Sequence, residues 1–395
     1  MKKQIPKLTK SRGQPQDLEL DEAADDLAWA ERAAYWEGAT ATRRPHPGQS
    51  RTRRRKKPEA LILSGHGVRL QVEHGALVVQ NGFTHYPQKR EAWRLFPGQR
   101  NLPDRIVMLD GNGSLSFDVL AWLSEQRIPL VQINWQGEVI TVLGGNPHAA
   151  DIHLVEAQRY AADGPRGLEI SLELIKQKIQ GCQATLRSFA ESLPRERALS
   201  KLEHALEELA FPTTSIESLR LIEGRAALAY FGFWQTLPLN WKGTGRKPIP
   251  EDWRRMGARV SAISGTNRNA THPVNAMLNY VYGMLESQVR IATVAAGLDP
   301  TLGFLHANRP GRVALVYDLM EPLRSHADRL LLEFVMSRKF SPGDFVVNEV
   351  GVCRLHPQLA RAISTLAVDA TAIESFLLRT LATLTSGSSQ GEKLG

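Results

Sequence analysis

The chain has 395 residues, 42% of them hydrophobic and 23% charged, and it contains no uninterrupted apolar run long enough to cross a bilayer. This length can bury a full core and predicts two domains plus tails, and the polar residues after Met1 give no sign of a secretion signal. Cys182 and Cys353 are the only cysteines, which excludes a disulfide framework or a thiolate zinc site and leads us to expect a cytoplasmic protein. The net charge of +8 favours a polyanionic partner without identifying one. We expect no membrane partner.

Residues 1–58 are dominated by two blocks of like charge, and we expect them to be a disordered extension. Gln16–Arg32 holds seven acids against one base. A basic block without any acid follows, with Arg43, Arg44, Arg51, Arg53, Arg54, Arg55, Lys56 and Lys57. Like charges repel and keep a chain extended, although Leu18–Trp36 is able to form one short helix. The basic block is either a DNA-binding arm or a solubilising tail.

Short β runs separated by glycine turns predict a small β-rich domain over residues 60–143. The turns are placed at Gly65, Gly67 and Gly75. The expected strands are residues 60–64, 68–72, 76–79, 105–109, 129–133 and 138–142. Ser114 is the expected N-cap of a helix, and the turn at residues 135–137 predicts a hairpin.

From residue 144 to residue 386 the apolar residues recur every three or four positions, which predicts an all-α domain. Two antiparallel helices are expected first, with Cys182 in the core. Thr214 then opens a third helix through a capping box with Glu217. Glu223 lies at the margin of its apolar stripe, where a carboxylate is costly unless it is paired, protonated or bound to a metal. Residues 387–395 are an expected flexible tail.

Residues 237–260 mix cations with aromatic side chains, a composition typical either of a nucleic-acid surface or of a loop that closes over the core. The candidate DNA contacts among these cations are Arg246, Lys247, Arg254 and Arg255. The longest helix is expected to start at His272 and to end at Ala296, before Gly297. Three of its polar residues recur at helical spacing and are predicted to point into one polar site: Asn275, Asn279 and Tyr282.

The stretch of residues 303–321 contains a histidine, a basic turn and two acids. His306 follows an apolar run, and residues 309–312 form the basic turn. Asp318 and Glu321 are three residues apart and fall on one face of a helix. Imidazole with carboxylates suits a divalent cation, and the flanking arginines suit phosphate. The alternative is a hydrogen-bonded histidine beside a solvated acidic helix face.

Three sequence blocks, in this order, resemble the CRISPR-associated protein 1 family over about residues 60–370. The blocks are Glu223–Ala227 with Tyr230 and Phe231, then His272–Tyr282, then residues 303–321 with Arg324 and Asp328 after them. The family has a small β domain ahead of an α-helical catalytic domain, so the resemblance implies an α+β fold.

The resemblance also implies a function: a metal-dependent DNA integrase and endonuclease of CRISPR adaptation. Glu223, His306 and Glu321 are then the catalytic metal ligands for Mg²⁺ or Mn²⁺, with Asp318 in a supporting role. Histidine among oxygen ligands favours Mn²⁺. The implied partners are double-stranded DNA (protospacer and CRISPR repeat), CRISPR-associated protein 2 and a second copy of the chain. The expected phosphate contacts are Arg309, Arg312 and Arg324.

Some features depart from the family pattern. Pro322 directly follows Glu321 and is expected to kink or end that helix, so the third ligand is either Glu321 or Asp318. His272 is either a DNA contact or only a helix cap. Two other functions stay open. One is a transposon-borne integrase with the same catalytic domain, which the basic extension favours slightly. The other is a DNA-binding scaffold without catalytic activity.

Overall fold

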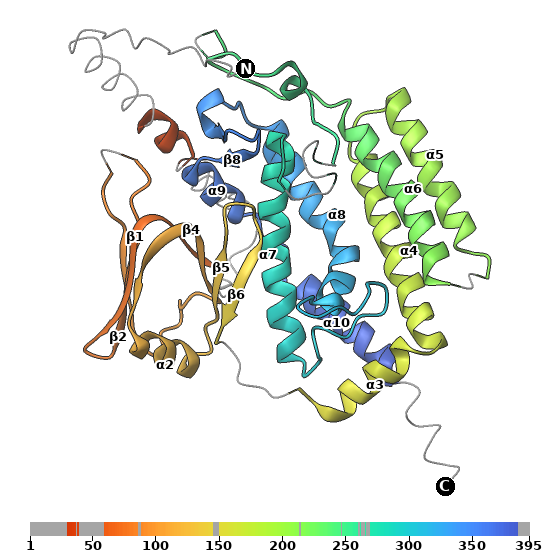
Figure 1. The fold of residues 1–395 in the computed structure, drawn as a ribbon, viewed down its shortest axis with the longest axis horizontal. Coiled ribbons are helices and arrows are strands. Elements are labelled where there is room, and N and C mark those ends of the chain that lie inside the picture. Colours follow the sequence, from red (N-terminus) through yellow and green to blue (C-terminus); the bar gives the residue numbers. More distant parts are fainter. Residues whose placement is uncertain are drawn as a thin grey trace, which may run out of the picture.

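A mixed β-sheet and a larger array of helices lie side by side in the computed structural model (Figure 1). The α+β fold expected from the sequence is therefore confirmed. Thr214, Arg246, the basic block and the predicted tail lie outside the described residues. The structure describes residues 30–36, 38, 59–85, 88–144, 150–212, 215–245, 247–259, 261, 265 and 269–385.

The sheet has six strands in the order β3-β2-β1-β4-β5-β6. The strands are β1 (Leu61–Glu73), β2 (Ala76–Gln80), β3 (Ala92–Leu95), β4 (Ile106–Leu115), β5 (Leu130–Ile133) and β6 (Val139–Leu143). β4 pairs in parallel with β1 and β5, and the helix α2 (Phe117–Glu125) makes the crossover between β4 and β5. The other pairs are antiparallel, including the predicted β5–β6 hairpin.

Two details of the sheet differ from the prediction. Gly65 and Gly67 do not separate two strands, because β1 continues through them with irregular register between Ser64 and Val68. Ser114 is not the N-cap of α2, because β4 extends to Leu115 and Ser116 takes the cap position. In both cases pairing with the neighbouring strand overrides a local turn or cap signal.

The sheet is covered on both faces, as its apolar strands require. Leu63 and Ile106 pack with Val119 of α2 in one cluster of buried side chains. Val107 and Ile133, from the opposite face, belong to the main core of the helical part. The buried side chains on one face of the sheet therefore belong to the same hydrophobic core as those of the helices.

The helical part holds α3 (Ile152–Ala162), α4 (Pro165–Arg187), α5 (Leu193–Glu208), α6 (Ile216–Trp234), α7 (Pro273–Ala295), α8 (Ala314–Met336), α9 (Pro357–Ser364) and α10 (Ala370–Thr385). α4 packs against α5, α6 and α8, and α7 packs between the sheet and α8 (Figure 1). Ser215 caps α6 by accepting a hydrogen bond from Ser218. A short sheet of β7 (Phe345–Val347) and β8 (Cys353–Leu355) interrupts the helices, which the all-α prediction did not include.

Pro322 lies inside α8, which neither ends nor begins there. The prediction that it ends the helix is therefore wrong. Proline removes one backbone hydrogen bond, but the residues around it, including Leu319 and Leu323, are buried in the core. This packing keeps Asp318 and Glu321 on one continuous helix.

The turn between β5 and β6 lies directly on α7. A Cβ atom at Gly283 of α7 would stand 2.1 Å from the carbonyl oxygen of Gly137, and one at Gly137 would stand 2.5 Å from the backbone of Asn279. Only glycine permits this approach of two backbones. The contact joins the sheet to the helix that leads to the candidate site.

A short segment of the charged extension is folded onto the helical part. Residues 30–36 are helical, which confirms this part of the predicted short helix, and Trp36 is buried. Its indole stacks on Phe334, contacts Phe340 and donates a 3.0 Å hydrogen bond from Nε1 to Asp344 Oδ1. The description of residues 1–58 as a disordered extension is therefore wrong for this helix, which is docked on the end of α8.

We predict that Trp36→Ala lowers the free energy of unfolding by about 3 kcal/mol or more, because it opens a cavity and leaves buried Asp344 without its indole donor. Urea denaturation followed by circular dichroism measures the change. Phe117→Ala is the matched control, since the Phe117 side chain is 88% exposed. An unchanged midpoint for the Trp36 variant would show that the helix does not dock.

Candidate active site

The loop that carries His306 is held in place by the carboxylate of Asp318, which is fully buried on α8. Its Oδ2 accepts backbone hydrogen bonds from Phe304 at 2.5 Å and from Leu305 at 2.9 Å. Its Oδ1 accepts from the backbone of His306 at 2.9 Å and contacts Nδ1 of the same residue at 2.6 Å. A carboxylate has about four acceptor positions, so these contacts fill Asp318. The alternative of Asp318 as third metal ligand loses its support.

The same contact orients the imidazole of His306. With Nδ1–H donating to Asp318, the proton is placed on Nδ1 and the lone pair is on Nε2. Nε2 lies 4.0 Å from Oε1 of Glu321. The Nε2 lone pair and the Glu321 oxygen are both electron donors. A cation between these two atoms is therefore favoured. A histidine whose second nitrogen binds a carboxylate is the usual arrangement at metal centres.

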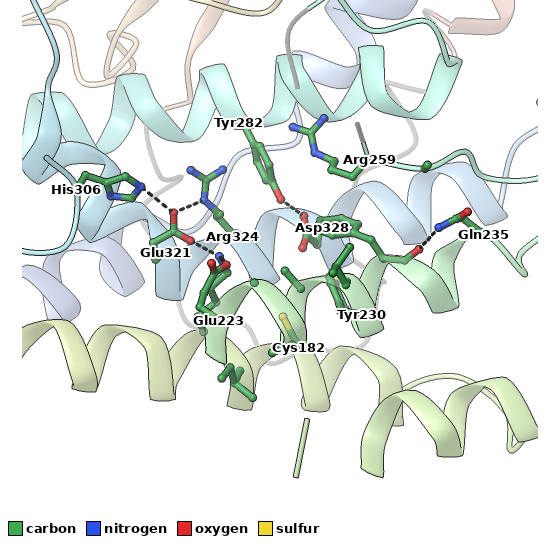
Figure 2. Close-up of a pocket in the computed structure, with 18 of the residues that line it drawn as sticks. Cys182, Glu223, Tyr230, Gln235, Arg259, Tyr282, His306, Glu321, Arg324 and Asp328 are labelled. Carbon is green, nitrogen blue, oxygen red and sulfur yellow. Dashed lines mark hydrogen bonds and ion pairs between the residues drawn. The ribbon is translucent and has the colours of Figure 1, made fainter. Parts of the chain in front are cut away.

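Glu223 of α6 and Glu321 of α8 lie near each other in the cavity (Figure 2). The ammonium of Lys178, from α4, pairs with both carboxylates. Lys178 Nζ lies 2.5 Å from Glu321 Oε2 and also pairs with Glu223 Oε1. Arg324 Nε donates to Glu321 Oε1 at 3.1 Å. Burial opposes ionisation of Glu321, but Arg324 and Lys178 outweigh burial and lower its pKa to about 2. Glu321 is therefore a carboxylate at neutral pH.

These side chains line a cavity of about 510 Å³ (Figure 2). A second cavity of about 330 Å³ shares Glu223, His306, Arg312 and Glu321 with it. The cations that line one or both cavities are Lys178, Arg220, Arg259, Arg309, Arg312 and Arg324. Such a concentration of cations suits a phosphate backbone.

The structure brings together Arg309, Arg312 and Arg324 of the predicted DNA contacts, since each lines at least one of the two cavities. Arg254 pairs with Glu251, and Arg255 donates to the carbonyl of Thr236. Neither lines these cavities, nor does Lys247. Arg246 lies outside the described residues, so its placement stays a prediction.

Of the three polar residues of α7, Asn279 and Tyr282 both line a further cavity of about 390 Å³, and Asn275 does not. Tyr282 lines the larger cavity and donates a 2.7 Å hydrogen bond to Asp328. Asn275 donates to the carbonyl of Ala258, and Asn279 accepts from Arg259 at 3.2 Å. The two asparagines therefore position the segment that carries Arg259, and of the three only Tyr282 lines the cavity that contains Glu223 and Glu321. His272 caps α7 by accepting from the backbone of Val274, which supports the cap alternative.

Burial raises the pKa of Asp328 to about 6, although the hydrogen bond from Tyr282 and the nearby arginines act in the opposite direction. Tyr282 also lies beneath two guanidinium groups, with the Arg324 Cζ atom 4.6 Å and the Arg259 Cζ atom 5.6 Å from its ring centroid. These contacts fix Arg324, which in turn holds Glu321. Asp328 therefore supports the site indirectly.

The donor types fit a divalent cation, although their present arrangement does not enclose one. Among the described residues, no three His, Cys, Asp or Glu side chains are gathered tightly enough to hold a metal ion. Two carboxylates and an imidazole nitrogen nevertheless face one cavity, and oxygen with imidazole donors suits Mg²⁺ or Mn²⁺. The position between the carboxylates is taken by the Lys178 ammonium.

Comparison with known proteins identifies the family. A family model described as CRISPR associated protein Cas1 matches residues 61–367. The chain belongs to the Cas1 family. It is 30% identical over 320 residues to CRISPR-associated endonuclease Cas1 1 of Archaeoglobus fulgidus, covering 77% of this chain and 85% of that protein. It is 32% identical over 274 residues to CRISPR-associated endonuclease Cas1 2 of Rhodospirillum rubrum, covering 65% of this chain and 73% of that protein.

Solved structures show the same fold. A casposase bound to integration product superposes with a TM-score of 0.65 at 23% identity, covering 83% of this chain and 91% of that one. A Cas1 protein from Thermotoga maritima gives a TM-score of 0.63 at 18% identity, covering 82% and 97%. The family model and the curated relatives confirm the sequence resemblance to the Cas1 family. Within the described residues, no helix combines the length and the apolar character needed to span a membrane.

Reasoning from the sequence missed Lys178 and Arg220, and it noted Arg259 only as one cation of residues 237–260 without choosing it as a DNA contact. Lys178 did carry a signal, because it is three residues after Ile175 and four before Cys182 and so lies on the apolar face of α4. A lysine there requires a buried partner. Arg220 supports the site differently, by donating to the carbonyl of Leu305 in the histidine loop.

We predict that Asp318→Asn lowers the free energy of unfolding by about 2 kcal/mol or more, because an amide presents an NH₂ group to donors that need an acceptor. Chemical denaturation measures the loss. Glu333→Gln, an exposed position on the same helix, is the control and is expected to stay within about 0.5 kcal/mol of the wild type. Equal stability of the two variants would contradict the role of Asp318.

Proposed function

We propose that this Cas1-family protein is a metal-dependent DNA integrase and endonuclease of CRISPR adaptation. It joins the 3′-hydroxyl ends of a protospacer to the CRISPR repeat by phosphodiester transesterification. The observation that carries the proposal is the meeting of Glu223, His306 and Glu321, from α6, a loop and α8, at one cavity lined with cations. The curated relatives named endonucleases support a nuclease or integrase activity.

The residues that would hold the metal ion are Glu223, Glu321 and Nε2 of His306. A bound Mg²⁺ or Mn²⁺ supplies Lewis acidity toward the scissile phosphate and lowers the pKa of a coordinated hydroxyl. Asp318 keeps the proton of His306 on Nδ1, which reserves Nε2 for a ligand. Arg324 holds Glu321 in its ionised form.

The arginines bind and orient the DNA backbone. In the transesterification, the 3′-oxygen of the protospacer end forms a bond to phosphorus as the 3′-oxygen of the target strand leaves and takes up a proton. The number of phosphodiester bonds is conserved, so no energy-rich cofactor is needed. Arg309 and Arg312 line the same cavity as His306 and would hold DNA phosphates beside the reacting one.

The proposed partners are protospacer and repeat DNA, CRISPR-associated protein 2, and a second copy of this chain in a homodimer. The casposase of similar fold is described as bound to an integration product. Another structure of similar fold, a Cas6-RT-Cas1–Cas2 complex, gives a TM-score of 0.63 at 18% identity, covering 87% of this chain and 36% of that one. Joining without an added partner would favour the transposon-borne alternative, and joining that depends on CRISPR-associated protein 2 favours the adaptation complex.

We predict that Glu223→Ala and His306→Ala each lower strand transfer by more than about 100-fold, since even outer-shell partners of metal ligands cost about 10–100-fold. The assay joins a labelled duplex with 3′-hydroxyl ends to a supercoiled plasmid in Mn²⁺. Binding of the same duplex, measured by fluorescence anisotropy, is expected to change little. If the variants lose binding and stability instead, the residues hold the fold and the proposal of catalytic ligands is wrong.

Arg309→Ala is predicted to weaken DNA binding and to reduce the slope of log affinity against log salt by about 1, because one phosphate contact is lost. Anisotropy titrations at several salt concentrations measure the slope. Arg187→Ala serves as the control, because Arg187 is an exposed arginine at the end of α4 that lines neither cavity. Identical salt slopes for the two variants would show that Arg309 does not contact a DNA phosphate.

A further inference from the structure

Lys178 is the one ammonium that contacts both candidate ligand carboxylates within the described residues, and the proposed reaction does not use it. Its side chain is 16% exposed, against 26% for Glu223 and 7% for Glu321. The aliphatic stem leaves α4 beside Ile179 and Cys182, which line the same cavity. Nζ is therefore directed between the carboxylates, and a surface lysine would instead extend into water.

The two carboxylates need a cation between them. Glu223 and Glu321 come from different helices, and two negative charges at this separation repel each other strongly where water is largely excluded. Lys178 supplies one positive charge and donates hydrogen bonds to both. Arg324 contacts the other oxygen of Glu321, Oε1, so it does not replace Lys178 between the two acids.

A divalent cation bound to both Glu223 and Glu321 would compete with Nζ for these two carboxylates. Glu223 Oε1 and Glu321 Oε2 both face Nζ, and an ammonium within hydrogen-bond distance of both oxygens leaves no room for a metal ion bonded to them. Nζ lies between Glu223 and Glu321, and Glu321 in turn faces Nε2 of His306 through its other oxygen, Oε1.

We infer that Lys178 is a positioning residue that holds Glu223 and Glu321 in place of a divalent cation and is displaced when the cation binds. The inference rests on the proposed function, since it takes these acids as the metal ligands. Cation binding is then an exchange of one ammonium for one metal ion at preformed carboxylates. The stem of Lys178 stays anchored on α4, so the released ammonium remains at the cavity, where a DNA phosphate is its available partner.

The exchange has a measurable consequence. A divalent cation that must displace an ammonium binds more weakly than one that meets two unpaired carboxylates. In the wild-type protein Lys178 therefore lowers the affinity for the metal ion and stabilises the metal-free state. Removing the ammonium is expected to reverse both properties, with tighter metal binding and lower stability without metal.

The test compares Mn²⁺ affinity, measured by electron paramagnetic resonance of free Mn²⁺, for the wild type, Lys178→Met and Lys178→Gln. Both variants are expected to bind Mn²⁺ about tenfold more tightly, which corresponds to about 1.4 kcal/mol. Melting temperatures are measured in parallel and are expected to fall without metal and to recover with Mn²⁺. Lys176→Met, on the same helix but outside the cavity lining, is the control and is expected to leave both quantities unchanged.

A folded Lys178 variant whose Mn²⁺ affinity is unchanged or weaker overturns the inference. If the methionine variant does not fold, the affinity is measured on Lys178→Gln. Its amide lacks the charge but still donates a hydrogen bond to a carboxylate, so this variant is expected to fold. Glu223→Gln distinguishes a failure of the proposed metal site from a failure of the proposed role of Lys178. If this variant binds Mn²⁺ as the wild type does, the proposed metal site itself is wrong. If it loses Mn²⁺ while the lysine variants show no gain, only the role of Lys178 fails.

Discussion

The buried carboxylate of Asp318 is the interaction on which the site depends. Asp318 accepts three consecutive backbone N–H groups from residues 304–306 and also contacts the imidazole of His306. One side chain thereby determines where the loop lies, how the imidazole is turned and which nitrogen carries the proton. Gly303 belongs to the same arrangement, because a Cβ atom there would stand 2.8 Å from Oδ2 of Asp318. The histidine is therefore placed by a helix, although it lies on a loop.

Around Asp318, the acidic and basic side chains of the site neutralise one another in ion pairs. Glu321 is ionised in a buried position because Lys178 and Arg324 neutralise it. Glu223 shares the lysine, and Arg324 is in turn held over the ring of Tyr282. Buried charges of this kind are stable only as a network, since removing one partner leaves another without compensation. An anionic DNA backbone and a divalent cation would enter this network by exchanging partners with charges already present.

The sequence predicted the parts of the site that are local. Glu223, His306 and Glu321 are readable from two of the three short blocks, and the helix start at His272 follows from its cap and proline. Contacts between distant segments were not readable in this way. Lys178 lay on an apolar stripe, but its two partners come from α6 and α8. Pro322 suggested a helix end, and only the burial of the surrounding residues explains why α8 continues.

The contacts of Trp36 in the charged extension could not be predicted from the sequence either. Its neighbourhood is rich in acids, a composition typical of disorder. Its binding surface consists of Phe334, Phe340 and Asp344, about 300 residues further along the chain. No local pattern could indicate such a contact. The short sheet of β7 and β8 lies in the same region and was missed for a similar reason, since its strands have three residues each.

The most direct test of this account is a crystal structure of the protein with Mn²⁺, with the ion located by its anomalous scattering. The account predicts one anomalous peak in contact with Glu223, Glu321 and Nε2 of His306, with the Lys178 ammonium moved away from both carboxylates and Asp318 unchanged. A crystal that contains Mn²⁺ elsewhere, while Lys178 still bridges Glu223 and Glu321, would contradict it.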